Sequence, residues 1–260
     1  MSTLQESIIM ANFAKDKALL AFYEQGLEDM HSFVAYLLFP KLQTIPMNEI
    51  TNDFLKQIKK EHKHERDIAK KAEFAIGYGG NGATIAKNTG VSNAQGEKVY
   101  NTYFEAFSGM KEYFDYVMYK TEQNHYIQYN NITKRKYFIP ETDPFIDYKD
   151  FDSWTIEGKE YSKARAEIQR KSQNYPIQGS ASDCSKLAGV IFFNNLLEKG
   201  WFNTVKICNM VHDEYEIESP DELVDEVKDL LINSMEKAGS YFCKLVPLKA
   251  TVDVGDHWIH

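Results

Sequence analysis

The sequence predicts an α+β fold in which a small antiparallel sheet is backed by helices. Helical patterns fill most of the first half of the chain, and two short alternating segments meet at His212-Asp213-Glu214 between two strong helical patterns. Helices separated from a hairpin, instead of alternating βαβ units, are typical of this class. With 260 residues and 43% hydrophobic content, the chain can bury the core of one or two domains.

Three helical stretches are predicted before the middle of the chain, at residues 5–24, 51–78 and 93–120. The third stretch is rich in aromatic residues, which we expect to lie in the core: Tyr103, Phe104, Phe107, Tyr113 and Phe114. Residues 126–160 contain two prolines and many acids, and are expected to form a loop or a small β-ribbon.

The second half is predicted to contain two further helices. One is expected to begin near Gly179 and to stop at Gly200. The other is expected to start with a capping box at Ser219-Pro220-Asp221-Glu222 and to end before Gly239, because a glycine often follows the last helical turn.

Residues Arg66, Lys70, Phe74 and Tyr78 follow one another at steps of four. On a helix such steps drift slowly around the axis, so two cations and two rings share a face. Cations bind phosphates, and an aromatic ring stacks on a base or sugar, so the face suits a nucleotide. The alternative is a charged helix whose rings simply pack inward.

Two more patterns indicate chemistry. The predicted hairpin places Asp213 and Glu214 at its turn, and carboxylates on a rigid strand end suit a hard divalent cation. Upstream, Arg170, Asn174 and Gln178 are again four residues apart. An exposed acidic turn and an ordinary polar helix surface are the respective alternatives.

Taken together and in this order, the three segments "ERDIAKKAEFAIGYGG", "RKSQNYPIQGSASDCSK" and "VKICNMVHDEYEIES" resemble the family A DNA polymerases, the DNA polymerase I type. The segment "QESIIMANFAKDKALLAFYEQGLEDMHS" is similar to the family's stretch from its first carboxylate motif to a phosphate-contacting histidine, here His31. The end "VGDHWIH" is similar to the family's usual chain end, so the resemblance covers nearly the whole chain.

The resemblance implies a palm at residues 1–28 and 166–260 and a largely helical fingers insertion at residues 29–165, with no thumb or exonuclease domain. It implies templated transfer of a dNTP to a primer 3′-hydroxyl with two Mg²⁺ ions, and primer-template DNA as partner. By the same resemblance, Glu6, His31, Arg66, Lys70, Phe74 and Tyr78 would bind the dNTP, Glu6 as a steric gate against ribose. Arg170, Asn174, Gln178 and His212 would bind DNA. Asp213, Glu214 and the main-chain carbonyl near Ser2 would bind metal, and Asp213, Glu214 and Lys70 would be catalytic.

One departure from the family pattern bears on function. The family has an Asp five residues before the position that matches Glu6, and Met1 stands there in this sequence. We therefore expect an N-terminal polymerase fragment to supply the thumb and this second catalytic Asp. A gene split by an intron or intein, a truncated form and a decayed copy all remain open as origins. The alternative function is a catalytically inactive remnant that binds dNTP or DNA.

Composition sets further limits. The net charge of −8 argues mildly against nucleic-acid binding, but basic islands at 59–71, 133–136 and 162–172 weaken that argument, since phosphate contact depends on local charge. The alternative for each island is a solvated face, which is the usual explanation of a charge run. No segment is apolar for long enough to span a bilayer, and the N-terminus lacks a signal-peptide pattern.

The three cysteines, Cys184, Cys208 and Cys243, lack zinc-site spacing. We expect reduced thiols in a cytoplasmic protein of a bacterial cell or of a phage-infected host.

The segment "GYGGNG" matches the dinucleotide-binding fingerprint through Gly77, Gly79 and Gly82. That fingerprint requires a preceding strand, whereas the residues before it are rich in Ala, Lys and Glu and predict a helix. We expect these glycines to end that helix instead.

Overall fold

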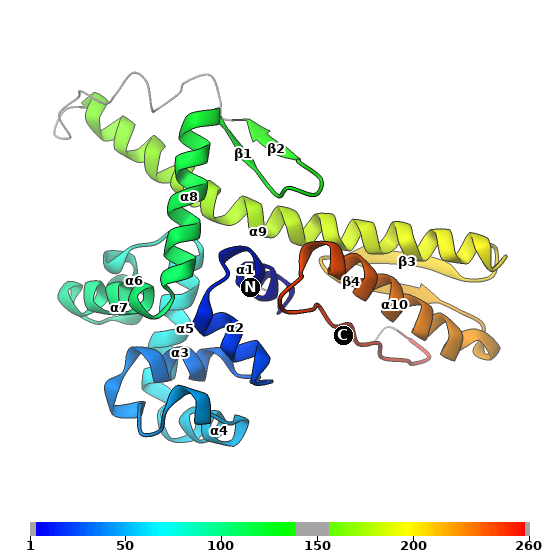
Figure 1. Ribbon diagram of the computed structural model, residues 1–260, viewed down its shortest axis with the longest axis horizontal. Helices are drawn as coiled ribbons and strands as arrows, with labels where there is room; N and C mark the ends of the chain where they lie inside the picture. The colour runs from blue at the N-terminus through cyan, green and yellow to red at the C-terminus, as the bar shows by residue number, and fades with distance from the viewer. Residues whose placement is uncertain (1–3, 139–155, 258–260) are drawn as a thin grey trace.

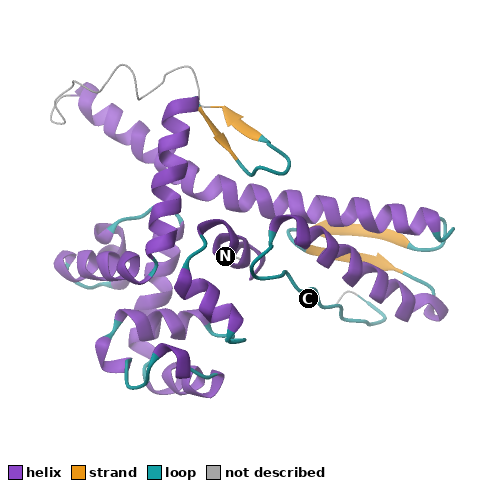
Figure 2. Ribbon diagram, viewed as in Figure 1, coloured by secondary structure: helices purple, strands orange, loops and turns teal. Residues whose placement is uncertain are grey.

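The computed structural model describes residues 4–138 and 156–257. It confirms the α+β class, with helices predominating and two small antiparallel hairpins (Figure 2). The long helix α9 (Ile156–Glu198) crosses the molecule, with the first hairpin on one side and the second beside its C-terminal half (Figure 1). α9 packs against α1 (Leu4–Ala14), α8 (Ser108–Asn124), α10 (Val224–Phe242) and β1 (Tyr126–Gln128).

The N-terminal part is helical as predicted, but each of the three predicted stretches is divided into two helices. The elements are α1 (Leu4–Ala14), α2 (Lys17–Glu24), α3 (Met30–Leu38), α4 (Asn52–Glu61), α5 (Lys63–Gly77), α6 (Gly82–Thr89), α7 (Asn93–Ala106) and α8 (Ser108–Asn124), with 3₁₀ turns η1 (Pro40–Leu42) and η2 (Met47–Glu49). The breaks fall at Lys15-Asp16, His62 and Phe107. They let the helices fold back on one another around a shared core.

Asp16 explains the first break. Its Oδ1 accepts hydrogen bonds from the backbone N–H groups of Ala18 and Leu19, which caps α2. Its Oδ2 accepts from the N–H groups of Gly109 and Met110 at the start of α8. One buried carboxylate thus serves the N-termini of two helices, where helix dipoles favour negative charge.

The helical region has its own hydrophobic core. It is built by buried residues of α1 to α8, with Phe22, Phe33 and Phe107 among the largest fully buried side chains. Four of the five aromatic residues predicted to lie in the core, Tyr103, Phe104, Phe107 and Phe114, are buried there, and Tyr113 packs against the cluster. The aromatic enrichment of this stretch therefore reflects packing.

The predicted start of the first helix in the second half of the chain is wrong. α9 begins at Ile156, not near Gly179, and passes through Pro176. Ile168, Ile177 and Ala181 are buried on both sides of that proline, so packing of one continuous face outweighs the hydrogen bond that proline removes. The end at Glu198, just before Gly200, agrees with the prediction.

The last helix also differs from its prediction. The structure has a 3₁₀ turn η3 (Asp221–Leu223) followed by α10 (Val224–Phe242), and no side chain among the described residues caps the N-terminus of α10. Gly239 lies inside α10, where a Cβ would approach Leu248 Cβ to 2.8 Å. This glycine allows close packing of the C-terminal segment and does not end the helix.

The two hairpins have defined registers. In the first, β1 (Tyr126–Gln128) pairs with β2 (Lys136–Phe138), which confirms a small β-ribbon within the range predicted for one. In the second, β3 (Lys206–Val211) pairs with β4 (Glu214–Glu218), with a bulge between Ile207 and Asn209.

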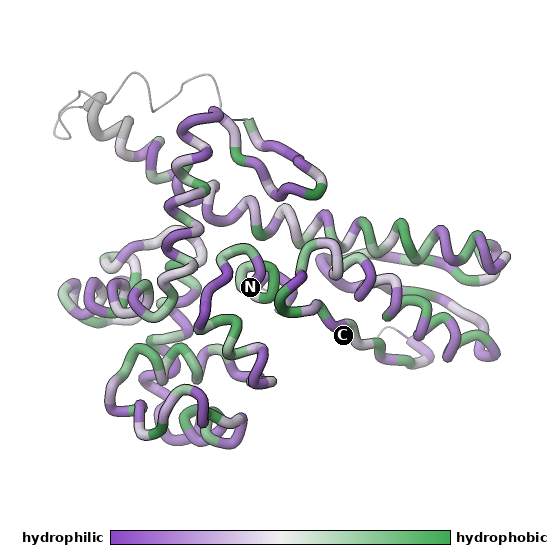
Figure 3. The backbone as a smooth tube through the Cα atoms, in the orientation of Figure 1, coloured by the Kyte–Doolittle hydropathy of each residue, from purple (hydrophilic) through white to green (hydrophobic). Residues whose placement is uncertain are grey.

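A second core joins α1, α9 and α10, and a third joins the C-terminal half of α9 to α10 and β4. Hydrophobic residues accordingly recur along that half of α9 (Figure 3). None of the described helices combines the length and the apolar character needed to cross a membrane.

Candidate functional site

The predicted stripe of cations and rings lies on α5 and at its C-terminal cap. The Lys70 Nζ atom is 5.9 Å from the centroid of the Phe74 ring. Tyr78 follows the last helical residue, and its side chain is 48% exposed. Since a helix and not a strand precedes the glycine-rich segment, a dinucleotide-binding turn is excluded and the predicted helix end is confirmed.

Arg66 is held in a network with α3. Its Nε donates to Asp29 Oδ2 at 3.1 Å and to Ser32 Oγ at 3.1 Å, and its Nη2 donates to Asp29 Oδ1 at 2.9 Å. Burial opposes ionisation of Asp29, but the hydrogen bonds from Arg66 and Ser32 outweigh it, so the pKa of Asp29 lies below its usual 3.8. The guanidinium is therefore oriented by a carboxylate before any ligand binds.

His31 lies beside the same face of α5. Its Nδ1 is 2.7 Å from Glu73 Oε2, and its ring centroid is 5.7 Å from that of Phe74. The structure thus gathers His31, Lys70 and Phe74 in one place, although they are up to 43 positions apart in the chain.

The end of α5 contacts the polar stripe on α9. A Cβ placed at Gly79 would lie 2.5 Å from Arg170 Cγ, and Gly79 has a φ of +73°. Arg170 and Gln178 are exposed, and Asn174 is half-buried, so the predicted stripe faces solvent along α9. Two of the three motifs found in the sequence therefore meet at Gly79 and Arg170.

A polar pocket of about 200 Å³ lies at this meeting point. Gly79, Gly80, Thr84, Tyr100, Arg170 and Gln173 are among the residues that line it. Gln173 is 9% exposed, and its Oε1 has no hydrogen-bond partner within the described residues. Sequence reasoning missed Gln173, because the helix was predicted to begin near Gly179 and the burial of position 173 follows only from the longer α9.

The acidic motif forms the predicted hairpin turn. His212 and Asp213 lie between the paired residues Val211 and Glu214, and His212 has a φ of +56°. This left-handed conformation is uncommon for a residue other than glycine and occurs often at functional sites. The Tyr215 hydroxyl donates to the Ser185 carbonyl of α9, which fixes the turn to that helix.

The acidic turn borders a large open hollow of about 1310 Å³. Gln5 of α1, Ser185 of α9, Asp213 and Glu214 all line it, and Gln5 Nε2 lies 3.4 Å from Ser185 Oγ. The start of α1, which carries Glu6, is therefore joined to the part of α9 that holds the turn. Ser2, the predicted carbonyl ligand, lies outside the described residues.

The turn offers the right kind of donor for Mg²⁺, since Asp213 and Glu214 supply carboxylate oxygens. Among the described residues, these carboxylates belong to no group of three His, Cys, Asp or Glu side chains placed to hold a metal. The chemistry of these two carboxylates still fits Mg²⁺.

An α+β chain with cations and rings on one helix, a polar stripe on a second helix and an acidic hairpin turn has the organisation of a nucleic-acid polymerase. The chain belongs to DNA polymerase family A, whose family model matches residues 4–260.

Curated relatives include DNA polymerase I of Aquifex aeolicus (strain VF5), 27% identical over 256 residues, with 96% of this chain and 37% of the relative covered. DNA polymerase I of Borreliella burgdorferi is 30% identical over 253 residues, with 97% of this chain and 24% of the relative covered. Among solved structures, "POL domain of Pol1 from M. smegmatis complex with DNA primer-template and dNTP" superposes with a TM-score of 0.70 at 25% identity, covering 95% of this chain and 37% of that chain. The chain thus spans well under half the length of each of these proteins.

Proposed function

We propose that this chain is the fingers and palm portion of a templated DNA polymerase, with a palm at residues 1–28 and 166–260 and fingers at 29–165. One observation carries the proposal: α9 supports all the motifs at once. Gly79 brings the nucleotide-binding face to Arg170, and Tyr215 fixes the acidic turn to Ser185 fifteen residues further along the same helix.

In this proposal α3 and α5 bind the incoming dNTP. Lys70, His31 and Arg66 neutralise the triphosphate, with Arg66 aligned by Asp29. Phe74 and Tyr78 hold the sugar and base, and Glu6 occupies the space that a ribose 2′-hydroxyl would need. Arg170, Asn174, Gln178 and His212 contact the primer terminus and the minor-groove acceptors that every base pair presents.

The chemistry is phosphoryl transfer. The primer 3′-hydroxyl oxygen forms a bond to the α-phosphorus, its proton passes to water, and the bond between that phosphorus and the leaving pyrophosphate oxygen breaks. Lys70 donates a proton to the pyrophosphate as it leaves. Mg²⁺, when bound, supplies Lewis-acid stabilisation of the entering and leaving oxygens, and Asp213 and Glu214 would hold it with a carboxylate from elsewhere.

The proposed partner is an N-terminal polymerase fragment with the thumb and the second catalytic Asp. All six residues of β3 are exposed, and within the described residues β3 pairs only with β4, so its other edge lacks a strand. β3 also exposes Ile207, Met210 and Val211. A free edge with exposed apolar side chains favours addition of an extended segment from another chain.

A second candidate function is a catalytically inactive remnant that binds dNTP or DNA, because Met1 stands where the family pattern has an Asp. Both functions predict dNTP binding by α3 and α5. They differ in whether any partner restores nucleotide incorporation.

The test is extension of a primed template by the purified chain, alone and with an N-terminal family A fragment that carries the thumb and the motif Asp. We expect background extension by the chain alone and Mg²⁺-dependent extension by the mixture. Asp213→Asn should abolish extension by the mixture while dNTP binding remains. Robust extension by the chain alone, in protein free of host polymerase, would contradict the need for a partner. dNTP binding without extension in any mixture would favour the remnant.

A further inference from the structure

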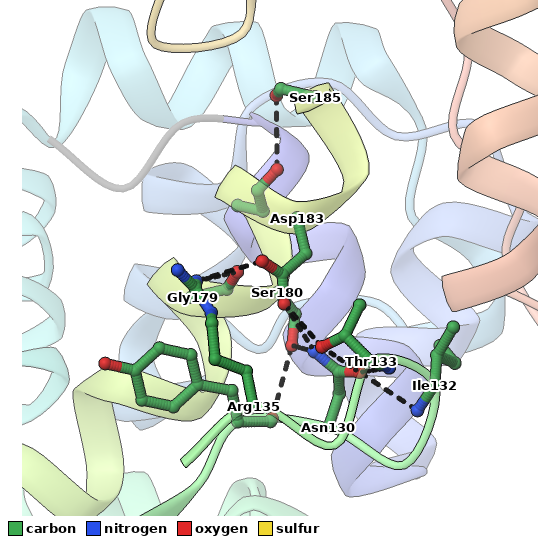
Figure 4. Close-up of polar contacts among 10 residues, drawn as sticks. Asn130, Ile132, Thr133, Arg135, Gly179, Ser180, Asp183 and Ser185 are labelled. Carbon is green, nitrogen blue, oxygen red and sulfur yellow. Dashed lines mark hydrogen bonds and ion pairs between the residues drawn. The ribbon is translucent and has the colours of Figure 1, made fainter. Parts of the chain in front are cut away.

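Residues 131–136 comprise most of the turn that joins β1 to β2 and the first residue of β2, Lys136, and are together called the turn. Buried polar side chains hold this turn in place. Asn130 Oδ1 accepts hydrogen bonds from the N–H groups of Ile132 and Thr133 at 2.9 and 2.7 Å. Its Nδ2 donates to Ser180 Oγ at 3.2 Å and to Asp183 Oδ2 at 3.1 Å (Figure 4). Asn130, Ser180 and Asp183 are all buried. The turn is therefore ordered by a network that extends into α9.

A second set of contacts fixes this turn on α9. Arg135 Nη2 lies 3.0 Å from Asp183 Oδ1 and donates to the Gly179 carbonyl at 3.0 Å. Thr133 Oγ1 donates to Asp183 Oδ2 at 2.7 Å. A Cβ placed at Gly179 would lie 2.2 Å from Tyr129 Cδ2, so glycine is what admits the Tyr129 ring to the helix surface.

The same turn presents two cations that no described carboxylate neutralises. Arg135 is engaged by Asp183, but in the part of the chain that the structure describes neither Lys134 nor Lys136 forms an ion pair with a carboxylate. Lys134 is exposed and has a left-handed φ of +55°. Lys136 Nζ lies 3.9 Å from the centroid of the Tyr126 ring, which holds its ammonium group at the surface.

The position of the turn relates it to the polar stripe on α9. Gly179 follows Gln178 directly, and successive helical residues are about 100° apart around the axis. The turn therefore flanks the exposed face that carries Arg170 and Gln178. Phosphates line both sides of a minor groove, so cations beside a helix that reads groove edges lie where a backbone passes.

We propose that residues 131–136 form a clamp for the sugar-phosphate backbone of duplex DNA, in which Lys134 and Lys136 contact phosphates. This inference rests on the proposed function, because α9 is assigned there to the primer-template duplex. A buried carboxylate network and a left-handed lysine are costly for a loop that only meets solvent. They are explained if the turn must hold two cations at a fixed spacing.

The test is fluorescence anisotropy of a labelled primed duplex with the full chain at several salt concentrations. The double variant Lys134→Ala/Lys136→Ala removes both proposed contacts. Lys199→Ala/Lys244→Ala is a matched control, because the Nζ atoms of these lysines also lie near aromatic rings, at 4.5 Å from the Trp201 centroid and 5.9 Å from the Tyr241 centroid, and the net charge changes equally. A third variant, Gly179→Ala, displaces the turn without changing charge.

For the double variant we expect the slope of log K against log salt to become shallower by about 2, since each phosphate contact contributes about 0.9. Its loss of affinity relative to the parent should shrink roughly tenfold between about 50 and 200 mM salt. Gly179→Ala should weaken binding in the same direction, and the control pair should keep the parental slope.

A double variant with the slope of its control would overturn the clamp and leave the proposed function intact. An effect on unprimed single strands but not on the duplex would also overturn it. Failure of the unaltered chain to bind primed DNA would overturn the DNA-binding part of the proposed function as well, so the two failures are distinguishable.

Discussion

Gly79 lies directly against Arg170, and a Cβ at position 79 would come within 2.5 Å of the arginine Cγ. The contact joins the end of α5 to α9, the two helices that carry most of the predicted dNTP and DNA ligands. The left-handed φ of +73° at Gly79 adds a second reason for glycine there.

Gly79→Ala should therefore destabilise the protein and displace Arg170. Gly90→Ala is the matched control, because Gly90 has a φ of +78° but a Cβ placed there would meet open space among the described residues. We expect a loss of about 1 kcal/mol for Gly90→Ala from backbone strain alone, and at least twice that for Gly79→Ala. Urea unfolding measures both. Equal losses of unfolding free energy for the two variants would mean that Gly79 is not in close contact with Arg170 of α9.

Asp16 should be one of the most important polar residues for stability. Asp16→Ala leaves N–H groups at two helix starts without their acceptor, and we expect a loss of about 2–4 kcal/mol in the free energy of unfolding. Asn81→Ala removes an exposed single cap of α6 and should cost only about 1 kcal/mol. Similar values for the two variants would show that Asp16 caps α2 only.

The Asp29–Arg66 pair predicts a pH dependence. Because the folded-state pKa of Asp29 is lowered, its carboxylate stabilises the folded protein above about pH 3.8, and this contribution is lost as the pH falls through the folded pKa. Asp29→Asn should therefore lower the free energy of unfolding at pH 7 by about 1–3 kcal/mol, and the difference from the parent should shrink in acid. Asp53→Asn, whose carboxylate is exposed beside Lys56, should change little at either pH. A pH-independent difference for Asp29→Asn would contradict the pairing.

The cysteines should differ in reactivity. Burial raises the pKa of Cys184 to about 11 and that of Cys243 to about 12, whereas Cys208 is exposed on β3. A thiol reagent at neutral pH should therefore label Cys208 alone in the native protein and all three cysteines after denaturation. Cys208→Ser should abolish native labelling. If the proposed partner adds to β3, it should also slow labelling of Cys208, and an unchanged rate in the active mixture would place the partner elsewhere.

The features predicted correctly from the sequence are local ones, in which the spacing of residues and their chemical types indicate the same structure. The stripe from Arg66 to Tyr78 required only helical periodicity, and the turn at Asp213 required only two alternating segments. Both follow from local rules that the structure obeys.

The failures have tertiary causes. Nothing local shows that Asp16 caps a helix 93 positions away as well as its own, so the breaks in the predicted helices were not foreseen. Gly179 and Gly239 resemble helix boundaries, yet each lies inside a helix and admits a neighbouring side chain, Tyr129 and Leu248 respectively. The pairing of Arg66 with Asp29 was missed for the same reason, since it joins α3 to α5.

The pairing of Arg66 with Asp29 gives Arg66 a different role from Lys70, the other cation of the predicted stripe on α5. Arg66 is engaged by Asp29 and Ser32, so Arg66→Ala should lower both the free energy of unfolding, by about 1–3 kcal/mol, and dNTP affinity. Lys70 lies beside the Phe74 ring and is proposed to protonate the leaving pyrophosphate. Lys70→Ala should therefore leave stability near the parental value but reduce the single-turnover incorporation rate, by about 10²–10⁴-fold, in the chain mixed with its N-terminal partner.

Lys71→Ala is the matched control for Lys70→Ala, since Lys71 is the next residue on the same helix and pairs with Asp67 at 2.7 Å. We expect it to change neither the rate nor the stability appreciably, because an exposed pair of this kind contributes little. If Lys70→Ala weakened only dNTP binding, Lys70 would be a phosphate ligand without a role in proton transfer. If it behaved like Lys71→Ala, the nucleotide would have to bind on a face of α5 other than the one that carries Lys70 and Phe74.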